Sequence, residues 1–278
     1  MSKKGAVLVT MSLATIAALG RWLSIEPFCA VAVAMQLAVY LVDGLPNRTE
    51  RCYDLSGSAT HVCVVVMAVL LAPRKTPRHL LASFAAVVWA ARLGTYLFLR
   101  IAKDKRDGRF DKLRHNAVGF LAAWTIQALW VVVVELPVLL LARDEDAGLS
   151  VRDGLGLALW LAGFVLELVA DTQKFAFRCE HPDAFVHTGV WRFSRHPNFA
   201  GEIAAWVGLA IVASPTTYAA WLSPAFTALL LTKGTGIPPL EKAAQARYGG
   251  DPAFVHYTAH TSVLLPWFPA PPLQNKNE

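Results

Sequence analysis

Long apolar runs recur along the sequence, and they restrict the possible folds more than any other feature. An α-helix needs about 20 apolar residues to cross the hydrocarbon core of a bilayer, which is roughly 30 Å thick. Runs of this kind lie at 6–22, 26–43, 59–73, 80–101, 117–142, 154–174, 199–213 and 217–232. Because several are short, the sequence predicts seven or eight spans. We therefore expect an all-α, polytopic membrane helix bundle of about seven transmembrane helices.

Composition and charge favour a membrane protein over a nucleic-acid-binding one. Hydrophobic residues make up 55% of the sequence and charged residues only 17%, which is too little polar content for a typical soluble domain. The net charge of +6 is spread over short loops, without a zinc-finger spacing or a basic and aromatic repeat. The four cysteines are scattered and form no CxxC pair, so we expect reduced cysteines and no metal site.

Basic residues predict which loops face the cytoplasm. Two lysines precede the first apolar run, which we interpret as a retained span rather than a cleaved signal peptide. Alternating spans then place the loops 44–58, 102–116 and 175–198 on the cytoplasmic side, and 102–116 is rich in Lys and Arg, as the positive-inside rule expects. The basic loop 73–79 conflicts with the rule. We expect a multi-pass protein, in the endoplasmic reticulum of a eukaryote or the inner membrane of a bacterium.

Charged residues and amides enter apolar sequence between Glu167 and Trp206. At intervals of four, three and four residues stand Glu167, Asp171, Lys174 and Arg178. The next predicted helix carries Asn198, Glu202 and Trp206 at intervals of four. Residues three or four apart share a helix face, and polar groups within a membrane usually mark a buried functional site. The two helices should therefore face one another.

Two flanking segments lie close to this polar stretch in the sequence. Pro197 suits the first turn of the helix that follows Arg195 and His196, and a helix start attracts anions. The alternative, in which both are only interfacial positive residues, stays open. The short amphipathic segment after Pro238 carries Glu241, Arg247, Tyr248 and Tyr257. These residues either fold back over the site or form a solvated face.

In the first half of the chain, Asp54 precedes an apolar run, while Arg92, Tyr96 and Arg100 follow one another at intervals of four. An Asp at a helix start is usually a cap, and a Tyr at a span is usually an interface anchor. If the protein catalyses a reduction, Asp54 and Tyr96 gain another role, because a hydride acceptor requires a proton donor or a group that polarises it.

Several motifs together resemble the steroid 5-alpha-reductase-like membrane family. They are RLGTYLFLRI, DGRFDKLR, ELVADTQKFAFR, TGVWRFSRHPNFAGEIAAW and LEKAAQARYG. The chain is most similar to the uncharacterised branch that shares the 3-oxo-5-alpha-steroid 4-dehydrogenase C-terminal domain. The resemblance extends from about Tyr53 to Phe268, and it is specific in the second half of the chain.

This resemblance implies a helical membrane enzyme that uses NADPH to reduce an activated carbon–carbon double bond of a lipid or steroid-like substrate. It implies a single domain over 1–268, with the cofactor bound by 118–268, and we expect a disordered tail at 269–278. The cofactor-binding positions expected from it are Asp171, Arg178, Asn198, Glu202 and Tyr248, and we add Glu167, which belongs to the same polar stripe as Asp171. Glu167 replaces an Asn of the steroid reductases, and the tail lacks their His-rich run, which weakens the case for steroid specificity.

Roles follow from side-chain chemistry within this hypothesis. Arg178, with Arg106 or Arg109, would neutralise phosphates, since guanidinium groups match phosphate oxygens. Asp54 and Tyr96 would act on the substrate carbonyl, with Asp54 protonated in a dry pocket.

Two alternatives remain. An S-adenosylmethionine-dependent enzyme of the isoprenylcysteine carboxyl methyltransferase type shares the RHP helix start, and a non-catalytic lipid- or sterol-binding protein could retain the same fold. The expected partners are the bilayer and a small lipid, and the sequence leaves the substrate and the oligomeric state open.

Overall fold

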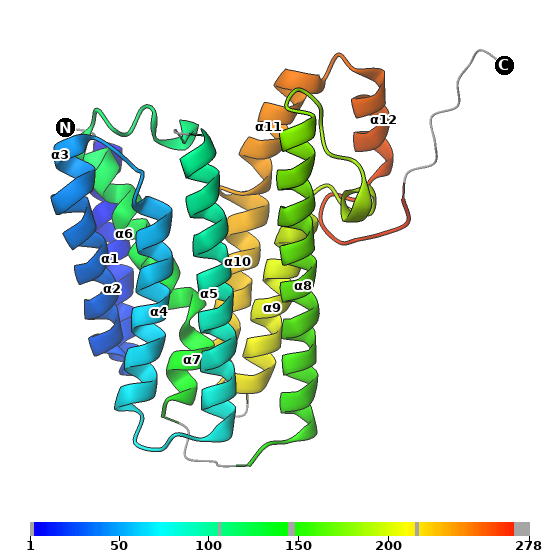
Figure 1. Ribbon diagram of the computed structural model, residues 1–278. Helices are drawn as coiled ribbons and strands as arrows, with labels where there is room; N and C mark the ends of the chain where they lie inside the picture. Colours follow the sequence, from blue (N-terminus) through cyan, green and yellow to red (C-terminus); the bar gives the residue numbers. More distant parts are fainter. Residues whose placement is uncertain (1–2, 105–106, 144–147, 215–216, 270–278) are drawn as a thin grey trace. The chain divides into compact units, whose positions relative to one another are not determined.

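The structure is a computed structural model that describes residues 3–104, 107–143, 148–214 and 217–269, and these residues form helices and connecting loops without strands (Figure 1). Within them, six helical stretches are long and apolar enough to cross a membrane. They are Lys3–Leu23, Glu26–Asn47, Tyr53–Leu71, Pro77–Ile101, Ala117–Val134 and Val151–Glu180, and Pro197–Ala213 is a shorter apolar helix. The predicted all-α polytopic membrane architecture is confirmed.

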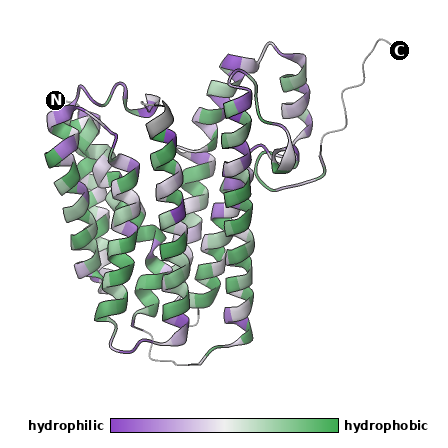
Figure 2. Cartoon of the chain, viewed as in Figure 1, coloured by the Kyte–Doolittle hydropathy of each residue, from purple (hydrophilic) through white to green (hydrophobic). Residues whose placement is uncertain are grey.

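The chain divides into two compact units. Unit 1 comprises Met1–Gly154 and Ala210–Ser223, and unit 2 comprises Leu155–Leu209 and Pro224–Glu278. The helices that lie wholly in unit 1 are α1 (Lys3–Leu23), α2 (Glu26–Val39), α3 (Leu45–Asn47), α4 (Tyr53–Leu71), α5 (Pro77–Asp104), α6 (Ala117–Val134) and α7 (Leu136–Leu141). The others are α8 (Val151–Glu180), α9 (Pro197–Ala213), α10 (Leu222–Lys233), α11 (Ile237–Tyr248) and α12 (Pro252–His260). Along the long helices apolar residues predominate, as expected of spans (Figure 2).

In unit 1, α4 packs against α5, and both α1 and α2 pack against α6. Gly5 of α1 and Gly119 of α6 allow close approach, because a Cβ atom at Gly5 would lie 3.0 Å from the Gly119 nitrogen. A buried aromatic cluster of Tyr40, Phe110, Phe120 and Trp124 joins α6 to the loop before it. Such rings bury large apolar areas, so this cluster fixes the loop that carries Arg109.

Two of the apolar runs form shorter helices than the sequence predicted. The run 117–142 is interrupted between α6 and α7 at Glu135, because Pro137 has no N–H to donate and its ring crowds the preceding turn. The run 217–232 contains a short 3₁₀ turn at Tyr218–Trp221 and then α10, which has 12 residues. A helix of that length rises about 18 Å, less than the thickness of the hydrocarbon core.

In unit 2, glycines bring α8 and α9 into backbone contact. A Cβ atom added at Gly163 would lie 2.5 Å from the Gly201 carbonyl oxygen, and one at Gly208 would lie 2.5 Å from the Gly156 carbonyl oxygen. Small residues of this kind let transmembrane helices approach closely. The predicted facing of these two helices is therefore confirmed.

The loop between α8 and α9 is covered by aromatic residues of α11 and α12. The ring of Phe185 lies 5.2 Å from that of Phe254 and 5.5 Å from that of Tyr257, measured between centroids. The Tyr257 hydroxyl donates to the Trp191 carbonyl oxygen at 2.7 Å. The amphipathic segment therefore folds back over the start of α9, which is one of the two arrangements the sequence left open. The expected disordered tail lies, from residue 270 on, outside the described residues.

Candidate functional site

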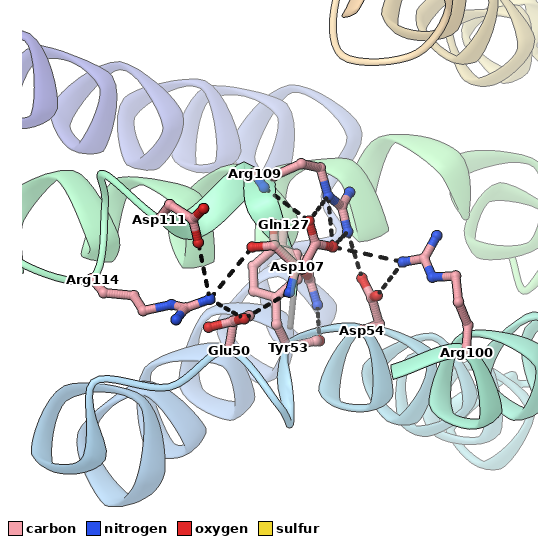
Figure 3. Close-up of polar contacts among 9 residues, drawn as sticks. All are labelled: Glu50, Tyr53, Asp54, Arg100, Asp107, Arg109, Asp111, Arg114 and Gln127. Carbon is pink, nitrogen blue, oxygen red and sulfur yellow. Dashed lines mark hydrogen bonds and ion pairs between the residues drawn. The ribbon is translucent and has the colours of Figure 1, made fainter. Parts of the chain in front are cut away.

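Polar residues gather in two places, one in each unit. In unit 1, Asp54 stands in the first turn of α4. Nη2 of Arg100, near the end of α5, lies 3.1 Å from one oxygen of Asp54. Nη2 of Arg109, in the loop before α6, lies 3.5 Å from the other (Figure 3). Asp54 is thus an ion-paired carboxylate between two guanidinium groups.

Asp107 completes this group. The Nη2 atom of Arg109 lies 2.6 Å from Oδ2 of Asp107, and Arg100 lies 3.7 Å from the same oxygen. Burial raises the pKa of Asp107, but the hydrogen bonds and charge of Arg109 outweigh it and hold the pKa below its usual value. Burial lowers the pKa of Arg109, and the carboxylates of Asp107 and Asp54 raise it to well above its usual value. Asp107 and Arg109 are therefore both charged at neutral pH.

A second contact ties the loop 107–114 to the segment before α4. Nη2 of Arg114 donates to Oε1 of Glu50 at 2.6 Å, and the Asp107 backbone N–H donates to the same oxygen at 3.1 Å (Figure 3). Glu50 is only 7% exposed. The side chain of Gln127 on α6 donates to the Tyr53 carbonyl oxygen at 2.7 Å. The loop, α4 and α6 therefore hold Asp54 in a fixed position.

The other predicted residues of unit 1 have different outcomes. Tyr96 is half-buried on α5, one turn before Arg100, so it lies on the helix that supplies one guanidinium to Asp54. Arg106 lies outside the described residues. The role assigned to Asp54 from the sequence needs a protonated carboxyl, whereas the structure shows both of its oxygens in ion pairs. These pairs must open before Asp54 can donate a hydrogen bond.

In unit 2 the central contact joins α8 to α9. Nδ2 of Asn198 donates to Oδ1 of Asp171 at 3.2 Å, and Asp171 is 4% exposed. A carboxylate only accepts, so this bond fixes the orientation of the Asn198 amide. Among the described residues, the buried Oδ1 of Asn198 has no hydrogen-bond partner. The site therefore offers a buried, oriented acceptor.

The remaining predicted residues of unit 2 fall into a buried and an outer set. Glu167 and Glu202 are buried on α8 and α9, and a Cβ atom at Gly201 would lie 2.7 Å from the Glu167 nitrogen. Arg178 is exposed near the end of α8. Tyr248 of α11 donates its hydroxyl to the Ala184 carbonyl oxygen at 3.2 Å. The structure thus brings Asp171 and Asn198 together and places Tyr248 over the loop that follows α8.

The start of α9 is held by Glu241 of α11. Nη1 of Arg195 lies 2.8 Å from one oxygen of Glu241, and Nε2 of His196 lies 2.7 Å from the other. The hydrogen bond with His196 lowers the pKa of Glu241, and the charge of Arg195 adds to this effect while burial opposes it. Arg195 and His196 are therefore structural partners of α11.

Comparison with family models matches residues 39–261 to DUF1295, a family described as of unknown function. The chain belongs to the DUF1295 family. No curated protein and no solved structure matches the chain.

The DUF1295 match contains both polar groups, from Glu50 near its start to Tyr257 near its end. Sequence reasoning missed Glu50, Asp107 and Arg114, because the basic residues of this loop were interpreted as topology determinants. The acids that alternate with them in DGRFDKLR were the available signal, since acids inside a basic loop are natural ion-pair partners.

Proposed function

We propose that this DUF1295 protein is a membrane oxidoreductase that uses NADPH to reduce an activated carbon–carbon double bond of a lipid or steroid-like substrate. The observation that carries the proposal is the Asp171–Asn198 pair, which leaves a buried amide oxygen available as an acceptor. Burying a polar atom without a hydrogen bond is costly, so a ligand that donates to Oδ1 of Asn198 would be bound favourably. The similarity to the steroid 5-alpha-reductase-like family supports the same conclusion.

The residues present fit such a cofactor. Oδ1 of Asn198 suits the N–H group of a carboxamide or the hydroxyl of a sugar, and its orientation is already fixed by Asp171. Fixing a binding group in advance reduces the entropy lost on binding. Glu202, one turn along α9 from Asn198, supplies a further buried acceptor group.

Guanidinium groups would hold the phosphates. Arg178 is exposed at the end of α8, and its planar group can donate two parallel hydrogen bonds to a phosphate. We assign the same role to Arg106 and Arg109. The side chain of Arg109 is 53% exposed although it pairs with Asp107, so it retains surface for an anion.

The bound cofactor supplies the hydride. The chain supplies orientation and polarisation: the Tyr96 hydroxyl would donate a hydrogen bond to the carbonyl oxygen of an enone and make its β-carbon more electrophilic. Asp54 would assist once its ion pairs with Arg100 and Arg109 open on substrate binding. Tyr96 and Asp54 are therefore proposed for the chemical step, and Asn198, Glu202 and the arginines are proposed for cofactor binding.

The test uses purified full-length protein and compares two arginines at opposite ends of α8. Arg178→Ala should weaken NADPH binding by about 1.5–3 kcal/mol, the range for a charged hydrogen bond. Arg152→Ala removes the same charge from an exposed residue in the first turn of the helix and should leave the affinity unchanged. Equal losses in the two variants would contradict a phosphate contact at Arg178 and indicate a general charge effect.

A further inference from the structure

A histidine and a glutamate are paired inside the membrane-spanning part of unit 1, apart from the residues considered above. Nδ1 of His61, on α4, lies 2.8 Å from Oε1 of Glu135, at the break between α6 and α7. Their side chains are 1% and 0% exposed, respectively. The pair is therefore a fully buried ionisable dyad that joins α4 to the end of α6, and both helices are long and apolar enough to cross a bilayer.

The surroundings of the dyad are aromatic. The ring of His61 meets Trp89 of α5 at 5.4 Å and Trp130 of α6 at 4.6 Å between centroids, edge to face in both cases. Among the described residues, His61 is the ionisable group that acts on Glu135. On α5, the charged residue closest in sequence to Trp89 is Arg92, about one helical turn further along. Nε2 of His61 and Oε2 of Glu135 have no hydrogen-bond partner among the described residues.

The charge state of such a pair follows from desolvation. A neutral imidazole beside an ionised Glu135 would place a net negative charge in a low-dielectric interior, which is strongly unfavourable. One added proton makes the pair neutral overall, either as imidazolium and carboxylate or as imidazole and carboxylic acid. We infer that His61 and Glu135 together bind one proton at neutral pH and form a buried proton-binding site within the membrane.

Both neutral forms of the pair keep the contact between the two residues. In one form an imidazolium donates Nδ1–H to the Glu135 carboxylate, and in the other the Glu135 carboxyl group donates its proton to Nδ1 of His61, across the same 2.8 Å. The proton therefore lies on one side or the other of this hydrogen bond, and the pair as a whole holds it.

A role of this proton in catalysis rests on the proposed function, whereas the binding of the proton by His61 and Glu135 does not. Reduction of a double bond forms one C–H bond with the hydride electron pair, and the π electrons then take a proton at the neighbouring carbon. The dyad is a buried donor for that proton, and water would reprotonate it afterwards. His61 shares a face of α4 with Ser58 and Asp54, at a rise of about 10 Å from Asp54 for seven residues.

The test is nuclear magnetic resonance of full-length protein with ¹⁵N-labelled histidine, at about pH 8, where exposed histidines are neutral. The signal of His61 is assigned with His61→Gln, and that of His196, which also contacts a carboxylate, with His196→Gln. In the wild-type protein, either His61 should carry protons on both ring nitrogens or Glu135 should show the infrared C=O band of a carboxylic acid. His79, which is equally buried but has no hydrogen-bond partner for its ring nitrogens among the described residues, should be neutral and serves as the matched control.

Removing either partner should move or release the proton. In Glu135→Gln the His61 ring should be neutral, and in His61→Gln an infrared carboxylic C=O band should be present that is absent from the double variant. A wild-type band of this kind with a neutral His61 would also support the dyad, with the proton on Glu135. A neutral His61 beside an ionised Glu135 in the wild-type protein would overturn the inference. If His61→Gln does not fold, the signal that changes in Glu135→Gln identifies His61 instead. NADPH binding is measured separately, so each idea can fail alone.

Discussion

Asn198 donates a hydrogen bond to Asp171 at 3.2 Å, and this contact connects two successive helices at the level where their backbones touch through glycine. The bond uses one side of the amide and leaves the other side, Oδ1, as a buried acceptor. Packing and ligand recognition therefore depend on the same pair of helices. A change in either residue should affect cofactor affinity, while changes in the glycines should affect stability.

We predict that Asp171→Asn weakens NADPH binding, although it removes no direct cofactor contact. An Asn at this position both donates and accepts, so it no longer fixes the orientation of the Asn198 amide. The expected loss is about 0.5–1.5 kcal/mol, the range for a neutral hydrogen bond. Titration of the detergent-solubilised variant measures it. Affinity equal to the wild type would show that the Asp171 contact does not position Asn198.

The glycine contact predicts a steric effect on stability. Gly163→Ala places a methyl group 2.5 Å from the Gly201 carbonyl oxygen, so α8 and α9 must separate. Overpacking of this kind costs about 1–3 kcal/mol, which should appear as a lower midpoint of thermal unfolding. The control is Gly154→Ala, because a Cβ atom at Gly154 would meet nothing within 4 Å. A control variant that unfolds as early as Gly163→Ala would refute the close approach.

Tyr96→Phe should lower turnover far more than NADPH affinity. A hydroxyl that polarises the substrate acts on the transition state, and a general acid contributes typically 10²–10⁴-fold. The rate is measured as NADPH oxidation with a lipid extract of the cells that express the protein. Tyr40→Phe is a matched control, because its hydroxyl donates to the Ala117 carbonyl oxygen elsewhere in unit 1. Similar rates for Tyr96→Phe and wild type would place the donor elsewhere.

The pair of Glu241 with His196 predicts an acid-dependent loss of stability. The folded-state pKa of Glu241 lies below its usual value of 4.5, so its ionised form is stabilised in the folded protein. This contribution is fully present above about pH 4.5 and is lost as the pH falls through the lowered pKa. Glu241→Gln should therefore reduce the unfolding midpoint at neutral pH and flatten its fall below pH 4.5.

An exposed glutamate provides the comparison for that experiment. Glu180 lies at the exposed end of α8, and Glu180→Gln should leave the pH profile of the unfolding midpoint unchanged. If Glu241→Gln and the wild type lose stability in parallel from neutral pH to below pH 4.5, the contact with His196 contributes nothing to the fold.

The sequence predicted the elements that depend on local pattern. The length of the apolar runs predicted the membrane helix bundle. The spacing of the polar residues around Asp171 and Asn198 predicted that α8 and α9 face one another, because helical periodicity depends only on neighbouring residues. The break at Glu135 was missed, although Pro137 marks it, since the apolar run continues through both.

Contacts between distant segments could not be predicted in this way. Glu50 and Arg114 are 64 residues apart, and His61 and Glu135 are 74 apart, so no periodicity relates them. The partner of a buried charge is determined by which helices pack together, which a single sequence does not specify. This is why Asp54 was assigned as a dry, protonated acid, whereas the structure pairs it with Arg100 and Arg109.

The most direct test of the proposed reductase is calorimetric titration of the detergent-solubilised full-length protein with NADPH and, separately, with S-adenosylmethionine. We predict saturable heat with NADPH and none with S-adenosylmethionine, together with an affinity for NADPH that falls in Asn198→Ala but keeps its dependence on salt, because no charge is removed. Heat with S-adenosylmethionine alone would contradict the account and indicate methyl transfer, and heat with neither would indicate a protein that binds lipid without catalysis.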